Sequence, residues 1–204
     1  MRVLVIAGRE LKALFLSPIA YVVLALYFGI MGLIWWLITS QTFPAEYRLF
    51  AHEMHVFILF FIPAISMRAI ADERRTRTLE LLVTQPVRDW EIVLGKWLAC
   101  VGLLALMLVG TMQFWGLMHL WTEGALDDLP VLTAYLGLLL AGMLYVAIGV
   151  FCSAITENQL IAALVTFTII IGLYFVRILG ASGTGFWQDV FQQVSTTYHF
   201  DEFA

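Results

Sequence analysis

Residues 68–96 read RAIADERRTRTLELLVTQPVRDWEIVLGK, and this polar stretch decides how the rest of the chain is arranged. It holds six of the eleven lysine and arginine residues, while long runs without charge lie on both sides of it. An arginine at the centre of a membrane costs about 2.5–3.5 kcal/mol. The group Arg74, Arg75 and Arg77 therefore stays in water or at a membrane surface, whereas the flanking apolar runs are expected to cross the membrane.

The overall composition supports the same conclusion. Of the 204 residues, 62% are hydrophobic and 13% are charged, whereas a soluble domain is roughly half apolar and a quarter charged. We therefore predict an all-α membrane protein whose residues 1–204 form a single transmembrane domain. The net charge of −4 argues against nucleic acid as a partner. Cys100 and Cys152 lie in apolar runs and are expected to be small core residues, with a disulfide or a metal site as the alternative.

Five stretches are apolar and long enough to cross a bilayer, which takes about 20 residues. The predicted spans are residues 18–38, 54–71, 91–121, 130–153 and 159–178. Ser17 and Pro18 suit the N-cap and the first position of the first span. Asp89 suits the N-cap of the third span, and Pro130 is expected to start the fourth. Residues 39–53 are polar enough to form a loop.

Both ends of the chain are predicted to lie at a membrane surface. In residues 2–16, Arg2, Arg9 and Lys12 share one helical face, which indicates an interfacial helix. The alternative is that these residues are only the start of the first span. Residues 180–204 begin glycine-rich and become amphipathic, which favours a helix at, or dipping into, the interface.

The positions of the basic residues predict the orientation, because cytosolic segments of membrane proteins carry an excess of lysine and arginine. The apolar run at residues 3–7 is too short for a cleavable signal peptide, so the N-terminus is expected to stay in the cytosol. The inner side then carries Arg2, Arg9, Lys12, Arg68, Arg74, Arg75, Arg77, Arg88 and Lys96, and the outer side carries Arg48 and Arg177. Five spans place the C-terminus outside.

A search for catalytic groups finds no convincing set. Gly95-Lys96 resembles the end of a phosphate-binding loop, but that motif needs glycine where Trp90 stands. His52 and His55 are three residues apart, whereas the metalloprotease motif needs four; a shared metal is the less favoured alternative to an interfacial or hydrogen-bonded role. Gln113 is predicted to join helices within the membrane, with a substrate contact as the alternative.

The cytosolic stretch is different, because it combines exposed apolar residues with charge. Thr78 can cap a short helix over residues 79–83, and Pro86 follows its end. Leu81 and Leu82 would then be apolar and close to water. Such a helix suits docking into a groove of another protein; the alternative is a solvated, positively charged loop.

At these residues the chain resembles a known family. Residues 70–99, IADERRTRTLELLVTQPVRDWEIVLGKWLA, resemble the permease subunits of ABC-2 type exporters, and most closely those of the gliding-motility-type branch. The resemblance extends to the opening RELKALFLSPIAY and to the tail FWQDVFQQVSTTYHFDEFA, so it covers nearly the whole chain. Two departures are visible. The family usually has glycine where Arg77 stands. It also usually has six spans, with a re-entrant outer segment between the fifth and the sixth, whereas five spans are predicted here; residues 180–204 then match that re-entrant segment.

The resemblance implies that residues 72–90 form a coupling segment that meets a separate ATP-binding subunit. The residues that inherit this role by matched position are Glu73, Arg74, Arg75, Thr78, Glu80, Leu81, Leu82 and Pro86. Two copies of the ATP-binding subunit are expected, each holding ATP and magnesium, together with a second permease that is identical or related. This chain itself is expected to bind no cofactor, to hold no catalytic or metal site, and to contact membrane lipids.

The expected function is thus that of a permease subunit of an exporter in the bacterial cytoplasmic (inner) membrane. The uncharged spans favour an amphiphilic or lipid-linked cargo. The alternative is a membrane scaffold that does not transport and that anchors a cytosolic ATPase or a motility or secretion apparatus. An intramembrane enzyme is disfavoured, because no catalytic pair was found.

Overall fold

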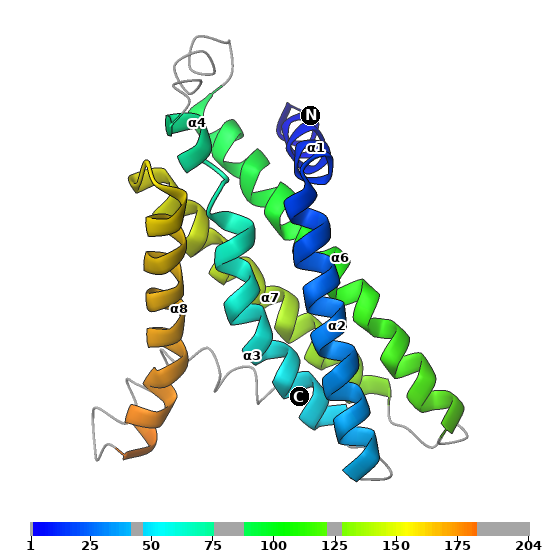
Figure 1. Ribbon diagram of the computed structural model, residues 1–204. Coiled ribbons are helices and arrows are strands. Elements are labelled where there is room, and N and C mark those ends of the chain that lie inside the picture. Colours follow the sequence, from blue (N-terminus) through cyan, green and yellow to red (C-terminus); the bar gives the residue numbers. More distant parts are fainter. Residues whose placement is uncertain (1, 42–46, 76–87, 122–127, 183–204) are drawn as a thin grey trace.

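The computed structural model describes residues 2–41, 47–75, 88–121 and 128–182, and within these ranges every regular element is a helix (Figure 1). The helices are α1 (Arg2–Leu16), α2 (Pro18–Gln41), α3 (Tyr47–Ser66), α4 (Ala71–Arg75), α6 (Asp89–Trp121), α7 (Asp128–Ile155) and α8 (Gln159–Ser182). Five helical stretches are long and apolar enough to cross a membrane: α2, α3 continued through α4, α6, α7 and α8. The prediction of an all-α membrane protein with five spans is confirmed.

Helix α3 lies at the centre of the bundle and packs against α2, α6, α7 and α8. Its side chains Phe50, Met54, Ile58 and Ile62 are fully buried. In Figure 1, α3 runs between α2 and α8. The other four spans therefore surround α3, and their outer faces carry most of the exposed large apolar side chains.

Helix α1 lies across one end of this bundle. Figure 1 shows α1 nearly end-on, whereas α2 runs along the bundle, so the chain turns sharply between them. Ser17 Oγ accepts the Ile19 N–H at 3.4 Å, and Pro18 is the first residue of α2. The predicted cap is confirmed, and residues 2–16 form a helix of their own instead of starting the first span.

Close packing of α1 against α6 depends on Gly95. A Cβ atom at this position would overlap the side chain of Ile6. Overlap of this kind forces side chains or backbone to shift, so glycine lets the two helices approach. The association of α1 with α6 is among the most extensive between any two of the described helices.

Several predicted boundaries differ from the observed ones by a few residues: α2 ends at Gln41, α7 at Ile155 and α8 at Ser182, so residues 180–182 belong to α8 and not to the predicted tail. Three further differences lie at the starts of helices. Helix α3 begins at Tyr47, so the second half of the predicted loop at 39–53 is helical. The physical reason is tertiary packing: the Phe50 ring lies 5.2 Å from the Trp35 ring and 5.3 Å from the Phe114 ring, centroid to centroid. Helix α7 begins at Asp128, before Pro130.

The third difference is the N-terminus of α6. Asp89 is the first helical residue instead of the cap. The Glu91 carboxylate accepts the backbone N–H of Arg88 at 3.0 Å, which is the arrangement of a capping box with Arg88 at the N-cap position. Cys100 and Cys152 are both buried and free, as expected for small core residues. The predicted helix at 79–83 and residues 183–204 lie outside the described residues.

Candidate functional site

The candidate site is α4, a helix of five residues at the end of the bundle where α1 also lies (Figure 1). A turn at residues 67–70 connects α3 to α4, and Ser153 of α7 holds this turn. The fully buried Ser153 Oγ accepts the N–H groups of Ile70 and Ala71, each at 3.0 Å, and donates to the Met67 carbonyl at 3.0 Å. One side chain of α7 therefore satisfies three backbone groups at the entrance to α4.

Lys96 forms the second attachment of α4. Its side chain is 3% exposed, and its Nζ lies 2.7 Å from Glu73 Oε1 and 3.3 Å from Glu10 Oε2. Burial of an ammonium group is costly unless the charge is paired. We call Glu10, Glu73 and Lys96 the Lys96 cluster. It joins α1, α4 and the first turns of α6 by charge-assisted contacts.

Asp72 provides a third attachment, to α8. Its carboxylate accepts a hydrogen bond from the side-chain amide of Gln159, the first residue of α8. It also lies 3.7 Å from the guanidinium of Arg68, four residues earlier in the connecting turn. Arg68 in turn donates to Ser17 Oγ at 3.2 Å, so this ion pair reaches back to the junction between α1 and α2.

Arg74 provides a fourth attachment, to the C-terminus of α7. Its guanidinium donates to the carbonyl of Ile155, the last residue of α7, at 3.3 Å. The final carbonyls of a helix have no partner within the helix, and a cation there is favourable. Asp72, Glu73 and Arg74 thus each contact a different helix.

These attachments determine what α4 can do mechanically. A helix of five residues is far too short to be stable alone, so its conformation depends on its tertiary contacts. Any displacement of α4 must either carry α1, α6, α7 and α8 along or break one of these polar contacts. The arrangement suits a relay that transmits movement of the chain after Arg75 to the spans.

The predicted interface residues are only partly placed by the structure. Glu73 and Arg74 lie in the site, and Arg75 is the last residue of α4. The remaining members of the predicted set lie outside the described residues; they are Thr78, Glu80, Leu81, Leu82 and Pro86. Their role stays a prediction.

Sequence reasoning missed Glu10, Lys96, Ser153 and Gln159 as members of the site. A signal existed for Lys96, because it is a charged residue at the start of a long uncharged run, directly after Gly95. The Gly95-Lys96 pair was compared with a nucleotide-binding loop, whereas its structural role is to admit α1 and to pair with two carboxylates. Ser153 and Gln159 carry no comparable signal.

The other polar residues that the sequence singled out lie elsewhere. His55 is fully buried, with Nε2 3.1 Å from the Tyr145 hydroxyl, which fits a hydrogen-bonded role. Among the described residues no three His, Cys, Asp or Glu side chains gather in a way that would hold a metal. Gln113 is exposed on α6 and makes no hydrogen bond to another described residue, so it does not join two of the described helices.

The fold and the site together define an integral membrane protein with a cluster of polar contacts at one end of its spans. A family model, ABC-2 family transporter protein, matches residues 36–199. The chain belongs to this family, and it is a non-catalytic membrane component of an ABC transporter, a class that works with an ATP-binding subunit. No curated protein and no solved structure was found to match the chain.

Proposed function

We propose that this chain is the permease subunit of an ABC exporter and that α4 relays the movement of the ATP-binding subunits to the spans. Two ATP-binding subunits, each with ATP and magnesium, act with this chain and with a second permease, identical or related. This chain binds no cofactor. The observation that carries the proposal is that three consecutive residues of α4 contact α8, α6 and α7.

The relay follows from the chain's connectivity. Residues 76–87 connect α4 to α6, and we assign contact with the ATP-binding subunit to Thr78, Glu80, Leu81, Leu82 and Pro86, together with Glu73, Arg74 and Arg75. A ligand or partner shifts a conformational equilibrium only if it contacts the two states differently. Closure of the ATP-binding subunits displaces residues 76–87, so its two states contact this segment differently. Helix α4 and the start of α6 then move together, because the Lys96 cluster joins them.

The proposed orientation places the α4 end in the cytosol of a bacterium whose cytoplasmic (inner) membrane holds the spans. Its support is the collection of basic side chains at this end, since Arg9, Lys12, Arg68, Arg74 and Lys96 all lie on elements that meet there. The gliding-motility-type branch is a hypothesis that rests on the sequence resemblance described above, chiefly at residues 70–99. The proposed cargo is amphiphilic or lipid-linked, because the spans contain little charge.

The test is co-purification of the tagged chain with the ATP-binding protein encoded beside it. The wild-type chain should retain the ATP-binding protein and stimulate its ATPase activity. The double variant Leu81→Asp/Leu82→Asp should lose both, whereas Leu129→Asp should lose neither. Leu129 is a suitable control because it is 76% exposed in the first turn of α7, at the other end of the bundle.

The outcomes separate the two candidate functions. Loss of binding in the double variant alone supports a permease with its docking segment in this region. Equal binding by all three proteins refutes the assigned interface. A stable complex whose ATPase rate never responds to the chain favours the scaffold.

A further inference from the structure

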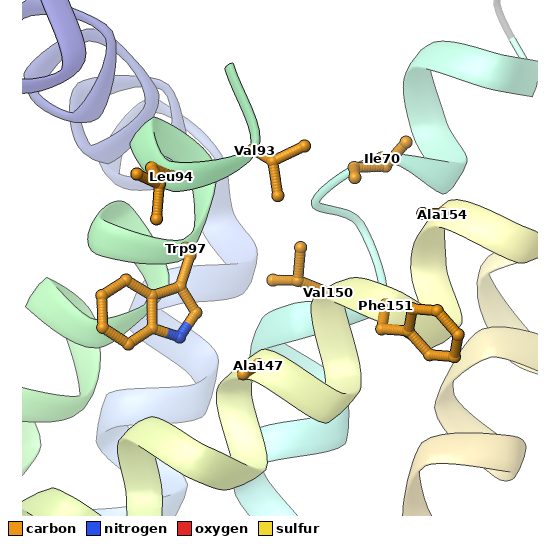
Figure 2. A pocket seen from close by; sticks show the side chains of 8 residues that line it. All are labelled: Ile70, Val93, Leu94, Trp97, Ala147, Val150, Phe151 and Ala154. Carbon is orange, nitrogen blue, oxygen red and sulfur yellow. The ribbon is translucent and has the colours of Figure 1, made fainter. Parts of the chain in front are cut away.

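An apolar pocket opens between α6 and α7, beside the turn that leads into α4 (Figure 2). Its volume is about 410 Å³, within the range of about 300–1,000 Å³ that is usual for small-molecule sites. The residues that line it are Ile70, Val93, Leu94, Trp97, Ala147, Val150, Phe151 and Ala154. Apart from the indole N–H, no polar side-chain group belongs to these eight residues, the described part of the lining.

The pocket is held open by fixed side chains. The Trp97 indole N–H donates to the Met143 carbonyl at 3.1 Å, which sets the orientation of the ring that forms one wall. Val150 is 3% exposed and forms the inner wall, whereas Phe151 is 64% exposed at the mouth. Figure 2 shows Leu94 and Trp97 of α6 on one side of the space and Ala147 and Val150 of α7 on the other.

A cationic side chain lies at the α4 end of this pocket. The backbone N–H of Arg74 bonds to the carbonyl of Ile70, a lining residue, at 3.1 Å. The Arg74 guanidinium bonds to the carbonyl of Ile155, the neighbour of the lining residue Ala154. Arg74 thus lies beside the pocket, bonded to the lining residue Ile70 and to the neighbour of the lining residue Ala154, and its side chain is exposed. A guanidinium has five N–H donors and binds phosphate with two of them at once.

The position of the pocket along the spans defines what can enter it. Its walls come from the second and third turns of α6 and the last three turns of α7, so it lies near the ends of these spans. Trp90, 52% exposed, lies one turn before Leu94, at the level where membrane proteins place tryptophan among lipid headgroups. The apolar pocket lies on the membrane side of this level and the arginine on its water side. This arrangement is complementary to a phospholipid, which has apolar acyl chains and an anionic phosphate.

We propose that this pocket binds one acyl chain of an anionic phospholipid from the leaflet around the α4 end, with the lipid phosphate held by Arg74. The acyl chain lies against Trp97 and Val150, and the headgroup lies beside α4. The bound lipid is a structural ligand and not the cargo, so the inference holds whether or not the chain exports anything. The lipid composition of this leaflet then becomes one of the factors that influence the position of α4.

The experiment uses the full chain in phosphatidylcholine nanodiscs that contain a photoreactive lipid. The probe is phosphatidylglycerol with a diazirine near the end of one acyl chain, and phosphatidylcholine with the same chains is the comparison. Both lipids carry a phosphate, but the choline cation of phosphatidylcholine competes with the Arg74 guanidinium for it. The anionic probe should therefore label residues 93–97 and 147–154 up to about fivefold more strongly, as expected for one exposed ion pair. Arg74→Gln should remove this preference.

Variants that fill the pocket test the site itself. Ala147→Trp should abolish labelling of the pocket, and Leu94→Trp, on the opposite wall, provides a second variant if the first does not fold. Leu164→Trp is the matched control, because Leu164 is 66% exposed on α8 and outside the pocket. Circular dichroism and gel filtration establish which variants are folded.

Three results would overturn the proposal. In the first, the two probes label the pocket equally, and neither Ala147→Trp nor Leu94→Trp changes this labelling. That result indicates bulk lipid around the spans. Labelling confined to other helices places the lipid elsewhere. Loss of pocket labelling when the partner subunits of the transporter are bound shows that a partner subunit covers the pocket instead. None of these readouts depends on ATPase coupling, so failure here is distinguishable from failure of the proposed function.

Discussion

Removal of the Lys96 charge is the most direct perturbation of the relay. Lys96→Met keeps the length of the side chain but leaves the carboxylates of Glu73 and Glu10 without their shared cation; these are 19% and 28% exposed. Loss of one partner from a buried ion pair costs about 3–5 kcal/mol. Because both carboxylates keep some contact with water, we expect about 3 kcal/mol, the lower end of that range.

A triple variant separates the stability of the cluster from its role in coupling. Lys96→Met combined with Glu10→Met and Glu73→Met leaves no unpaired charge, and replacement of a whole buried ion group by apolar side chains of similar volume is often neutral for stability. The triple variant should therefore recover the wild-type thermal unfolding temperature in detergent. Its stimulation of the ATPase should nevertheless remain about 5- to 150-fold below that of the wild type, the range that corresponds to a typical coupling free energy between two sites.

The assay measures ATPase activity of the purified complex relative to that of the ATP-binding subunit alone, so no cargo has to be known. Lys12→Met is the matched control, because Lys12 is an exposed lysine of α1 outside the cluster. Full ATPase stimulation by the triple variant would refute the reasoning, since the cluster would then be structural only. Unchanged stability of Lys96→Met alone would show that the ammonium is not needed to compensate the two carboxylates.

Two further substitutions test how α4 and α1 are attached. Ser153→Ala leaves the N–H groups of Ile70 and Ala71 without their acceptor, so it should destabilise the protein by about 1–3 kcal/mol per group. Hydrogen exchange of residues 67–75 should accelerate selectively. An equal acceleration along the whole chain would contradict this prediction. Gly95→Ala should destabilise by about 1–3 kcal/mol through overlap with Ile6, and the added change Ile6→Ala should restore the unfolding temperature; no recovery would mean that the overlap is not the cause.

The spans could be predicted from the sequence because their signal is local and large. A charged residue within the hydrocarbon is so costly that the ends of the uncharged runs come close to the ends of the membrane-crossing segments. The Ser17-Pro18 cap was predictable for the same reason, since an N-cap hydroxyl and a proline at the first position act within a few residues. Only short-range chemistry was needed in either case.

The start of α3 and the members of the site could not be predicted in this way. Polar residues around His52 and Glu53 made that stretch resemble a loop, but the packing of Phe50 against Trp35 makes it helical. Glu10 and Glu73 are far from Lys96 in the sequence. Helical periodicity shows which residues share a face, but it does not show which faces of separate helices meet.

The chemistry of the Lys96 cluster also indicates what it is for. If the only requirement were to hold α4 against α6, an apolar side chain at position 96 would serve as well as a buried ammonium, or better. A lysine with two carboxylates at 2.7 and 3.3 Å has a different property, because either carboxylate can remain its partner when the other moves away. Helix α4 can then shift relative to α1 while the buried ammonium keeps one carboxylate partner. A permanently fixed joint gains nothing from this property, whereas a relay that switches between two states requires it. The triple variant, stable but uncoupled, is the expected consequence.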